Sequence, residues 1–72
     1  LITFKDINFK DLMKELEKNF GIRIIIDNHT LDNYACSGKF RISDGIEQVL
    51  RALQQDAHFT IERESGTEIR IQ

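Results

Sequence analysis

Apolar residues follow a helical period in two segments of the chain, and these segments predict two helices. In each of them the apolar residues recur three or four positions apart, so that they line one side of a helix while the charged residues between them stay in water. The first helix has its apolar side at Phe9, Leu12, Met13, Leu16 and Phe20. The second has its apolar side at Ile46, Val49, Leu50 and Leu53.

Residues at the ends of these segments predict where each helix begins and stops. Asn8 or Asp6 can accept a backbone hydrogen bond at the start of the first helix. Gly21 follows the last apolar residue of that helix, where a left-handed conformation is easily adopted by glycine. For the second helix, Asp44 followed by Glu47 has the layout of a capping box.

Shorter runs with a period of two predict five strands. They cover residues 1–4, 22–27, 34–42, 58–63 and 67–71, with a candidate bend of the third strand at Gly38. In the second strand Ile22, Ile24 and Ile26 share one face, and Ile25 lies on the other. The turn at residues 65–66 predicts that the last two strands form an antiparallel hairpin.

The two halves of the chain repeat one pattern of apolar positions. An offset of 37 places seven apolar residues of the first half, from Phe9 to Ile24, on seven of the second half, from Ile46 to Ile61. The pattern predicts an α+β fold of two strand-helix-strand units and a last strand (βαβ-βαββ), with two helices packed against small β-sheets. Two repeats are too few for a solenoid, so we expect one compact layer of helices on sheet.

Length and charge restrict the classes of function. A chain of 72 residues makes one domain, and because it starts at Leu1 within an apolar run, we expect residues 1–72 to be a single domain excised from a longer chain. Ten basic side chains against twelve acidic ones provide no attraction to nucleic acid or anionic lipid. No apolar run approaches the ~20 residues of a membrane span, so no membrane contact by this domain is expected.

Gly38-Lys39-Phe40 contains parts of two nucleotide-binding motifs. A phosphate loop requires a glycine five residues before Gly38, where Asn33 stands, and a Ser or Thr in place of Phe40. The predicted order of elements also matches RNA-recognition modules, which need further aromatic residues beside Phe40 and a basic surface. The sequence therefore predicts no phosphate loop and leaves RNA binding as a distant alternative.

Residues suited to metal binding or nucleophilic chemistry are few. His29, Cys36 and His58 are separated by 7 and 22 residues, which matches no zinc pattern. No base stands near Cys36 in the sequence, so this single cysteine is expected to be a small core residue. The carboxylates fall in predicted turns, caps and strand faces. We expect no enzyme, no catalytic residue, no cofactor and no metal.

Three residues are candidate partner contacts: Ile25, Tyr34 and Lys39. Ile25 lies opposite the core-directed isoleucines of the second strand, and Tyr34 and Lys39 belong to the third. Two accounts of Ile25 remain open at this point. Either a second layer of the fold covers it, or it lies on a contact surface or at an exposed strand edge to which a partner adds a strand.

Short motifs over essentially the whole chain are typical of one regulator family. They are, in order, Ile2-Thr3-Phe4-Lys5, Leu12, Leu16, Phe20-Gly21-Ile22, Gly38-Lys39-Phe40, Asp44-Gly45-Ile46-Glu47-Gln48-Val49-Leu50 and Leu53. With them the chain resembles the C-terminal domain of FecR-type anti-sigma regulators. It departs from that family at Ile7-Asn8-Phe9, where a proline is common. It is also similar to the short N-terminal signalling domain of TonB-dependent receptors and secretins, in which helices lie between small sheets.

The resemblance implies a protein-protein interaction domain located in the periplasm. It would be the C-terminal domain of a regulator that spans the inner membrane once, and its partner would be the signalling domain of a TonB-dependent outer-membrane receptor. The N-terminal part of the regulator, outside these residues, would restrain a sigma factor in the cytoplasm. The alternative implied by the second likeness is a signalling domain of a receptor or secretin.

Overall fold

The computed structural model describes all 72 residues and contains five strands, two α-helices and two 3-10 turns. The strands are β1 (Ile2–Asn8), β2 (Arg23–Ile26), β3 (Ala35–Phe40), β4 (Ile61–Ser65) and β5 (Glu68–Ile71). The helices are α1 (Phe9–Phe20) and α2 (Ile46–Leu53), and the 3-10 turns are His29–Leu31 and Ile42–Asp44. The predicted α+β class and the order βαβ-βαββ are confirmed.

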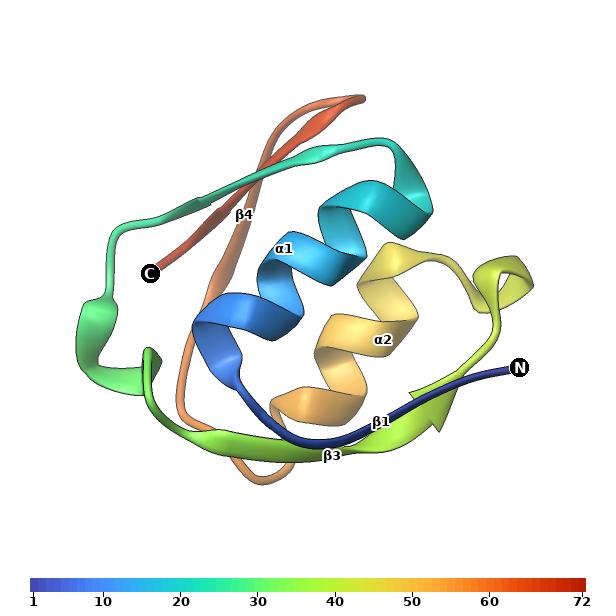
Figure 1. Cartoon of the computed structure of the whole chain (residues 1–72). Coiled ribbons are helices and arrows are strands. Elements are labelled where there is room, and N and C mark those ends of the chain that lie inside the picture. Colours follow the sequence, from blue (N-terminus) through green and yellow to red (C-terminus); the bar gives the residue numbers. More distant parts are fainter.

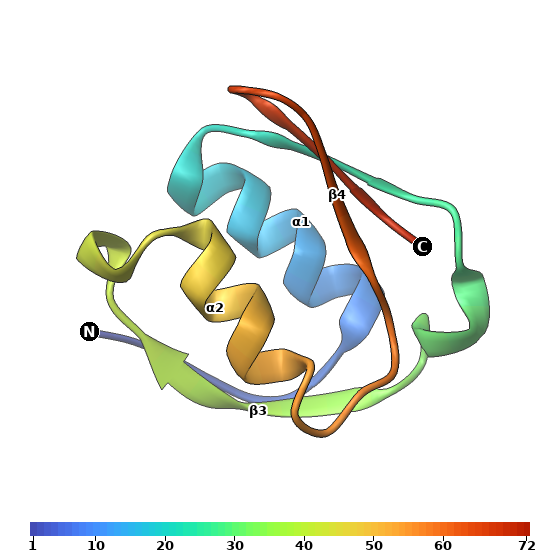
Figure 2. The same ribbon diagram turned by 180° about the vertical axis from the view of Figure 1, so that it is seen from behind.

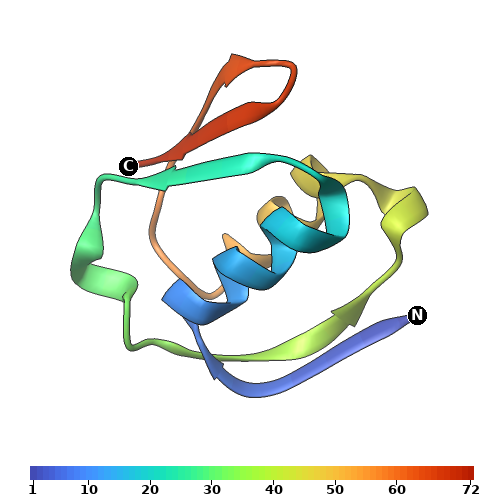
Figure 3. The ribbon, with the colours of Figure 1, turned by 45° about the horizontal axis from the view of Figure 1, so that its top comes forward.

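The strands form two small sheets on opposite sides of the helices (Figures 1 and 3). β1 pairs with β3 in one sheet, and β2, β5 and β4 follow one another in the other. α1 and α2 lie side by side between the two sheets (Figure 2). The predicted packing of two helices against small β-sheets is therefore confirmed, and the expected single layer of helices has strands on both of its sides.

Each sheet takes strands from both repeats of the chain. The strands that precede the helices, β1 and β3, pair with each other, and the strands that follow them, β2 and β4, flank β5. β5 runs parallel to β2 and antiparallel to β4, so the predicted hairpin of the last two strands is confirmed. Because the sheets are shared, neither repeat buries its apolar side without the other.

β1 extends to Asn8, beyond the predicted strand, because it continues through an irregularity. The pairing with β3 shifts between Phe4 and Ile7. Asp6 adopts a positive φ of 50°, a conformation that aspartate tolerates better than most residues, and its N–H donates to Ser37 Oγ at 3.0 Å. The polar residues that follow the predicted strand at residues 1–4 therefore form a bulge within the longer strand β1.

The structure corrects the ends of two other strands. The third strand stops at Phe40, and Ile42 lies in a 3-10 turn with 47% of its surface exposed. The fourth strand begins at Ile61 rather than His58. Before Ile61, Thr60 exchanges two backbone hydrogen bonds with Gln72, at 2.9 and 3.0 Å, so the chain is already paired with the residue that follows β5 one residue before β4 begins.

The ends of α1 agree with the sequence, whereas the start of α2 does not. Asn8 Oδ1 accepts from the N–H of Asp11 at 2.9 Å, so of the two candidate caps Asn8 is used. Gly21 ends α1 in the left-handed conformation, with φ 63°. The predicted capping box of α2 is wrong, because Asp44 accepts from the N–H of Arg41 in the 3-10 turn and Gly45 precedes the helix with φ 86°.

The core is entirely apolar and lies between the helices and both sheets. Fourteen residues are buried, and no polar or charged residue is among them. Both predicted helices contribute their apolar sides, and β5 adds Ile69 and Ile71. Aromatic pairs join separate elements: Phe9 contacts Phe59 edge-on with ring centroids 5.2 Å apart, and Phe20 stacks on Phe40 at 5.7 Å.

Replacing Leu50 by alanine should lower the free energy of unfolding by about 2–5 kcal/mol, because this side chain is fully buried in the only core of a small domain. Urea unfolding followed by circular dichroism measures the change. Arg51→Ala is the matched control, since Arg51 is the next residue of α2, is exposed and forms no ion pair. A loss for Leu50→Ala no larger than for the control would contradict the packing described above.

Candidate protein-interaction surface

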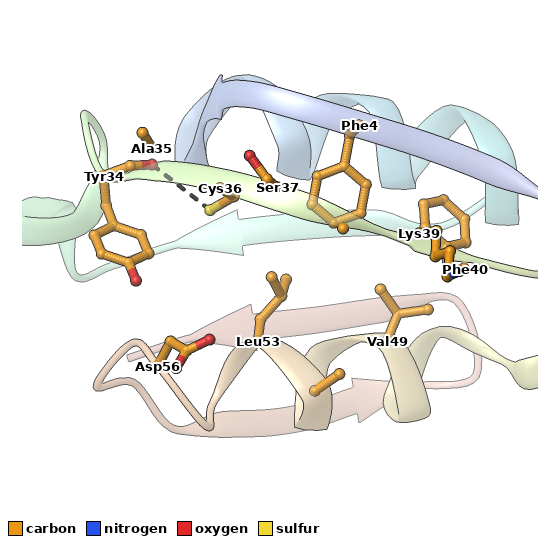
Figure 4. Close-up of a pocket in the computed structure, with 12 residues that line it drawn as sticks. Phe4, Tyr34, Ala35, Cys36, Ser37, Lys39, Phe40, Val49, Leu53 and Asp56 are labelled. Atoms are coloured by element: carbon orange, nitrogen blue, oxygen red, sulfur yellow. Dashed lines mark hydrogen bonds between the residues drawn. The ribbon is translucent and has the colours of Figure 1, made fainter.

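A groove between β3 and α2 brings two of the three predicted contact residues together (Figure 4). Its volume is about 320 Å³, and eight of its twelve lining residues are apolar. β3 and the residue before it supply one wall, α2 supplies the other, and the Phe4 ring of β1 points toward β3 from the side away from α2. Tyr34 and Lys39 lie at the two ends of the β3 wall.

The α2 wall was not predicted from the sequence. It is formed by Val49, Ala52 and Leu53, with Asp56 just beyond the end of the helix. Leu53 was expected to face inward, but its side chain is half-buried and contacts both the core and the groove. A small apolar residue at an exposed helical position, Ala52, is the one sequence signal for this wall.

The charged residues of the groove are unpaired and stand at opposite ends. Lys39 lies at one end, and Asp56 lies near Tyr34 at the other (Figure 4). Neither Lys39 nor Asp56 takes part in any of the six ion pairs of the structure. Tyr34 is 38% exposed. The groove therefore has an apolar middle, one basic end and one acidic end.

The edge of β3 that faces the groove has no backbone partner. β1 pairs with β3 on one side, and no backbone hydrogen bond joins residues 35–40 to any segment other than β1. A strand edge in this state exposes N–H and C=O groups that can pair with another extended chain. The groove thus combines an apolar wall with a row of free backbone donors and acceptors.

Cys36 and Gly38 form the inner face of β3 beneath the groove. Cys36 is 4% exposed and its Sγ donates to the carbonyl of Tyr34 at 3.6 Å, so its predicted place in the core is confirmed. Burial raises the pKa of the Cys36 thiol above its ordinary value. A side chain at Gly38 would meet Phe4, since a Cβ there would stand 3.0 Å from Phe4 Cζ. Glycine therefore allows the Phe4 ring to lie against β3.

Ile25 lies away from the groove, on the outer face of the other sheet. It is half-buried, does not pack against the core and stands opposite Arg70 of β5. No helix or strand covers this face (Figure 3), so the account in which a second layer of the fold covers Ile25 is wrong. The structure does not join Ile25 with Tyr34 and Lys39 in one surface.

The face around Ile25 carries an ion network centred on Arg70. Its Nη1 contacts both carboxylate oxygens of Asp27 at 2.9 and 2.8 Å, and its Nε donates to Glu64 at 2.8 Å. These contacts raise the pKa of Arg70 further above its already high value. The network links the end of β2 to β5 and β4, so the charged groups on this face are largely satisfied within the domain.

The soft ligand candidates do not converge. The structure contains no group of three or more His, Cys, Asp or Glu side chains placed to hold a metal ion. His29 Nδ1 instead contacts Asp32 Oδ2 at 2.9 Å within the turn before β3. Neither helix has the length and apolar character that a membrane span requires.

Phe40 does not face the solvent as a base-stacking residue would. It is buried, and it stacks on Phe20 of α1. RNA-recognition modules display such aromatics on one four-stranded sheet, whereas here the strands are divided between two sheets. The distant RNA-binding alternative is therefore inconsistent with the fold.

These features define a small α+β domain with an open groove rather than a convergent cluster of chemical groups. Residues 1–71 match the family described as "FecR, C-terminal". The chain belongs to this family and is the C-terminal domain of a FecR-like anti-sigma regulator. No curated protein and no solved structure gives a significant match. The family match confirms the resemblance read from the sequence and favours the regulator over the receptor or secretin domain.

Cys36 should react with a disulfide reagent at pH 8 at least about tenfold more slowly in the folded chain than in urea, because burial both shields the sulfur and reduces the thiolate fraction. Since the folded pKa is raised, the neutral thiol contributes stability below the ordinary thiol pKa of about 8.5, and this contribution is lost as the pH rises through the folded pKa. Absorbance of the released reagent measures the rate, and equal rates in both states would contradict the buried position.

Replacing Ile25 by aspartate should leave the domain folded, with a loss of about 1 kcal/mol in the free energy of unfolding, because this side chain lies outside the core. Urea unfolding measures the loss. Ile24→Asp is the matched comparison, since Ile24 is the neighbouring residue of β2 but faces the core, and it should unfold the chain. Unfolding by Ile25→Asp would contradict the outer position, and a folded variant that fails to bind a partner would make Ile25 a contact.

Proposed function

We propose that this domain works in the periplasm as the receptor-sensing part of a regulator that spans the inner membrane once. Its partner is the signalling domain of a TonB-dependent outer-membrane receptor. The proposal is supported by membership of the FecR C-terminal family and by a groove suited to a protein partner. The observation that carries it is the unpaired edge of β3 beside the apolar wall of α2.

The proposed work of the domain is recognition without chemistry. The charged groups of the groove, Lys39 and Asp56, lie at its two ends, an arrangement that orients a bound chain rather than one that shares a proton. The middle of the groove offers apolar contacts and free backbone groups, which are the means by which proteins bind extended segments. We therefore infer a binding module with no cofactor.

Signalling by such a module depends on a difference in affinity. A receptor that has bound its own ligand presents a changed surface, and the free energy available to shift the regulator equals the difference between its affinities for the two receptor states. The sigma factor is restrained by the N-terminal part of the regulator, which lies outside residues 1–71 of the family match. The present domain binds the receptor's signalling domain in the periplasm and so starts the signal.

The test is calorimetric titration of the 72-residue chain with the purified signalling domain of the TonB-dependent receptor encoded beside the regulator gene. We expect saturable binding with one site per chain, because the groove is a single continuous surface. The signalling domain of a receptor encoded elsewhere in the same genome is the control and should bind more weakly. Absence of binding to the neighbouring receptor's domain would rule the proposed partner out.

A further inference from the structure

We propose that the partner enters the groove as one extended strand, which pairs with the open edge of β3 and places alternate side chains against α2. This inference rests on the proposed function and specifies how the receptor domain is held. The bound segment is therefore an extended chain with alternating apolar residues. An acidic residue lies at the end of the segment near Lys39, and a basic residue lies at the end near Asp56.

The backbone of β3 determines which groups are free to pair. The N–H of Phe9 donates to the carbonyl of Tyr34 at 2.8 Å, and in an antiparallel ladder every second residue bonds to the partner strand. Counting on from Tyr34, the even-numbered residues of β3 direct their backbone groups to β1. The odd-numbered residues, Ala35, Ser37 and Lys39, direct their N–H and C=O groups to the open edge.

The side-chain surroundings suit a strand in this position. β1 lies on one side of β3 and α2 on the other, so a strand added at the open edge would extend the two-stranded sheet toward α2 (Figure 4). Successive side chains of a strand point to opposite faces. One set would contact Val49, Ala52 and Leu53, and the other would stay in water.

The unpaired charges determine the chemistry of the ends. Lys39 and Asp56 lie at opposite ends of the groove and have no ion partner in the domain. An acidic residue of the partner near Lys39 and a basic residue near Asp56 would complement both of them. Charge complementarity of this kind fixes the direction and register of a bound segment more than it adds affinity.

The other strand edges are less suited to the same role. On β2 the N–H of Ile24 is already bonded to the carboxylate of Glu17 at 2.7 Å. The groove beside β4 has one apolar residue among six and is crossed by the ion pair between Arg63 and Glu47 at 3.2 Å. The groove beside β1 is smaller, at about 270 Å³. Five of its nine lining residues are apolar, against eight of twelve in the groove beside β3. The β3 edge is thus the unpaired edge that lies beside the larger and more strongly apolar of these two grooves.

A pair of proline variants at one register position tests the edge. Lys39→Pro removes an N–H from the open edge of β3 and leaves the hydrogen bonds between β3 and β1 in place. Thr3 stands directly opposite Lys39, so Thr3→Pro removes an N–H from the outer edge of β1 and also leaves those hydrogen bonds in place. The dissociation constant for the neighbouring receptor's signalling domain should rise about tenfold or more for Lys39→Pro and stay unchanged for Thr3→Pro. Lys39→Gln, which keeps the N–H, should raise it about two- to fivefold.

A second pair of variants tests the α2 wall independently of β3. Ala52→Glu places a charge in the groove, and Gln48→Glu makes the same change of charge at an exposed position of α2 outside it. Binding should weaken about tenfold or more for Ala52→Glu and remain within about twofold for Gln48→Glu. Thermal unfolding of all variants confirms that they are folded. If a proline variant is unfolded, the comparison of Ala52→Glu with Gln48→Glu determines whether the partner binds in the groove.

Amide hydrogen exchange of the complex gives a direct readout. Binding of the receptor domain should protect the N–H groups of Ala35, Ser37 and Lys39, and leave that of Thr3 unchanged. If the unaltered chain binds but Lys39→Pro and Ala52→Glu bind equally well, the groove is not the site and the proposed function stands. If the unaltered chain does not bind, both proposals fail. A β3 edge that instead pairs with a second copy of this chain, seen as a dimer abolished by Lys39→Pro, would overturn the inference.

Discussion

The shared burial of two helices between two sheets is the constraint on which the whole domain depends. Each helix brings an apolar side, and the strands that cover it come from both halves of the chain. A core this small offers little stability in reserve, so the pairing of β1 with β3 and the insertion of β5 between β2 and β4 are both needed to close it. The apolar core can therefore form only when the strands divide into two sheets, one on each side of the helices.

This arrangement creates short sheets, and short sheets have several open edges. The domain closes some of them with its own side chains: Glu17 of α1 bonds to the backbone of β2, and the Glu47–Arg63 pair crosses the groove beside β4. The edge of β3 is left without such cover and lies beside apolar residues of α2. The proposed sensing role requires a surface that remains available in the folded state, and an unpaired edge beside an apolar groove meets that requirement.

The candidate site was predictable in part. The sequence predicts Tyr34 and Lys39 as contact residues on the third strand, and the structure places both in the groove. Strand alternation predicts that Ile25 faces away from the core, and it does lie on an outer face, but on the other sheet and among paired charges. The α2 wall is not predicted, because its one sequence signal is the small apolar residue Ala52, and a single residue of this kind does not distinguish a contact surface from an ordinary helix face.

The local sequence by itself determined the helices, the end of α1 at Gly21 and the order of elements, because these depend on contacts within a few residues. It left the cap of α1 open between Asn8 and Asp6, of which the structure uses Asn8. It did not determine the start of α2, where Asp44 turns back to Arg41. Only the tertiary structure decided that the strands separate into two sheets, since strand pairing depends on which segments distant in sequence can bury the helices together. The groove between β3 and α2 follows from that pairing, so no property of either segment alone could reveal it.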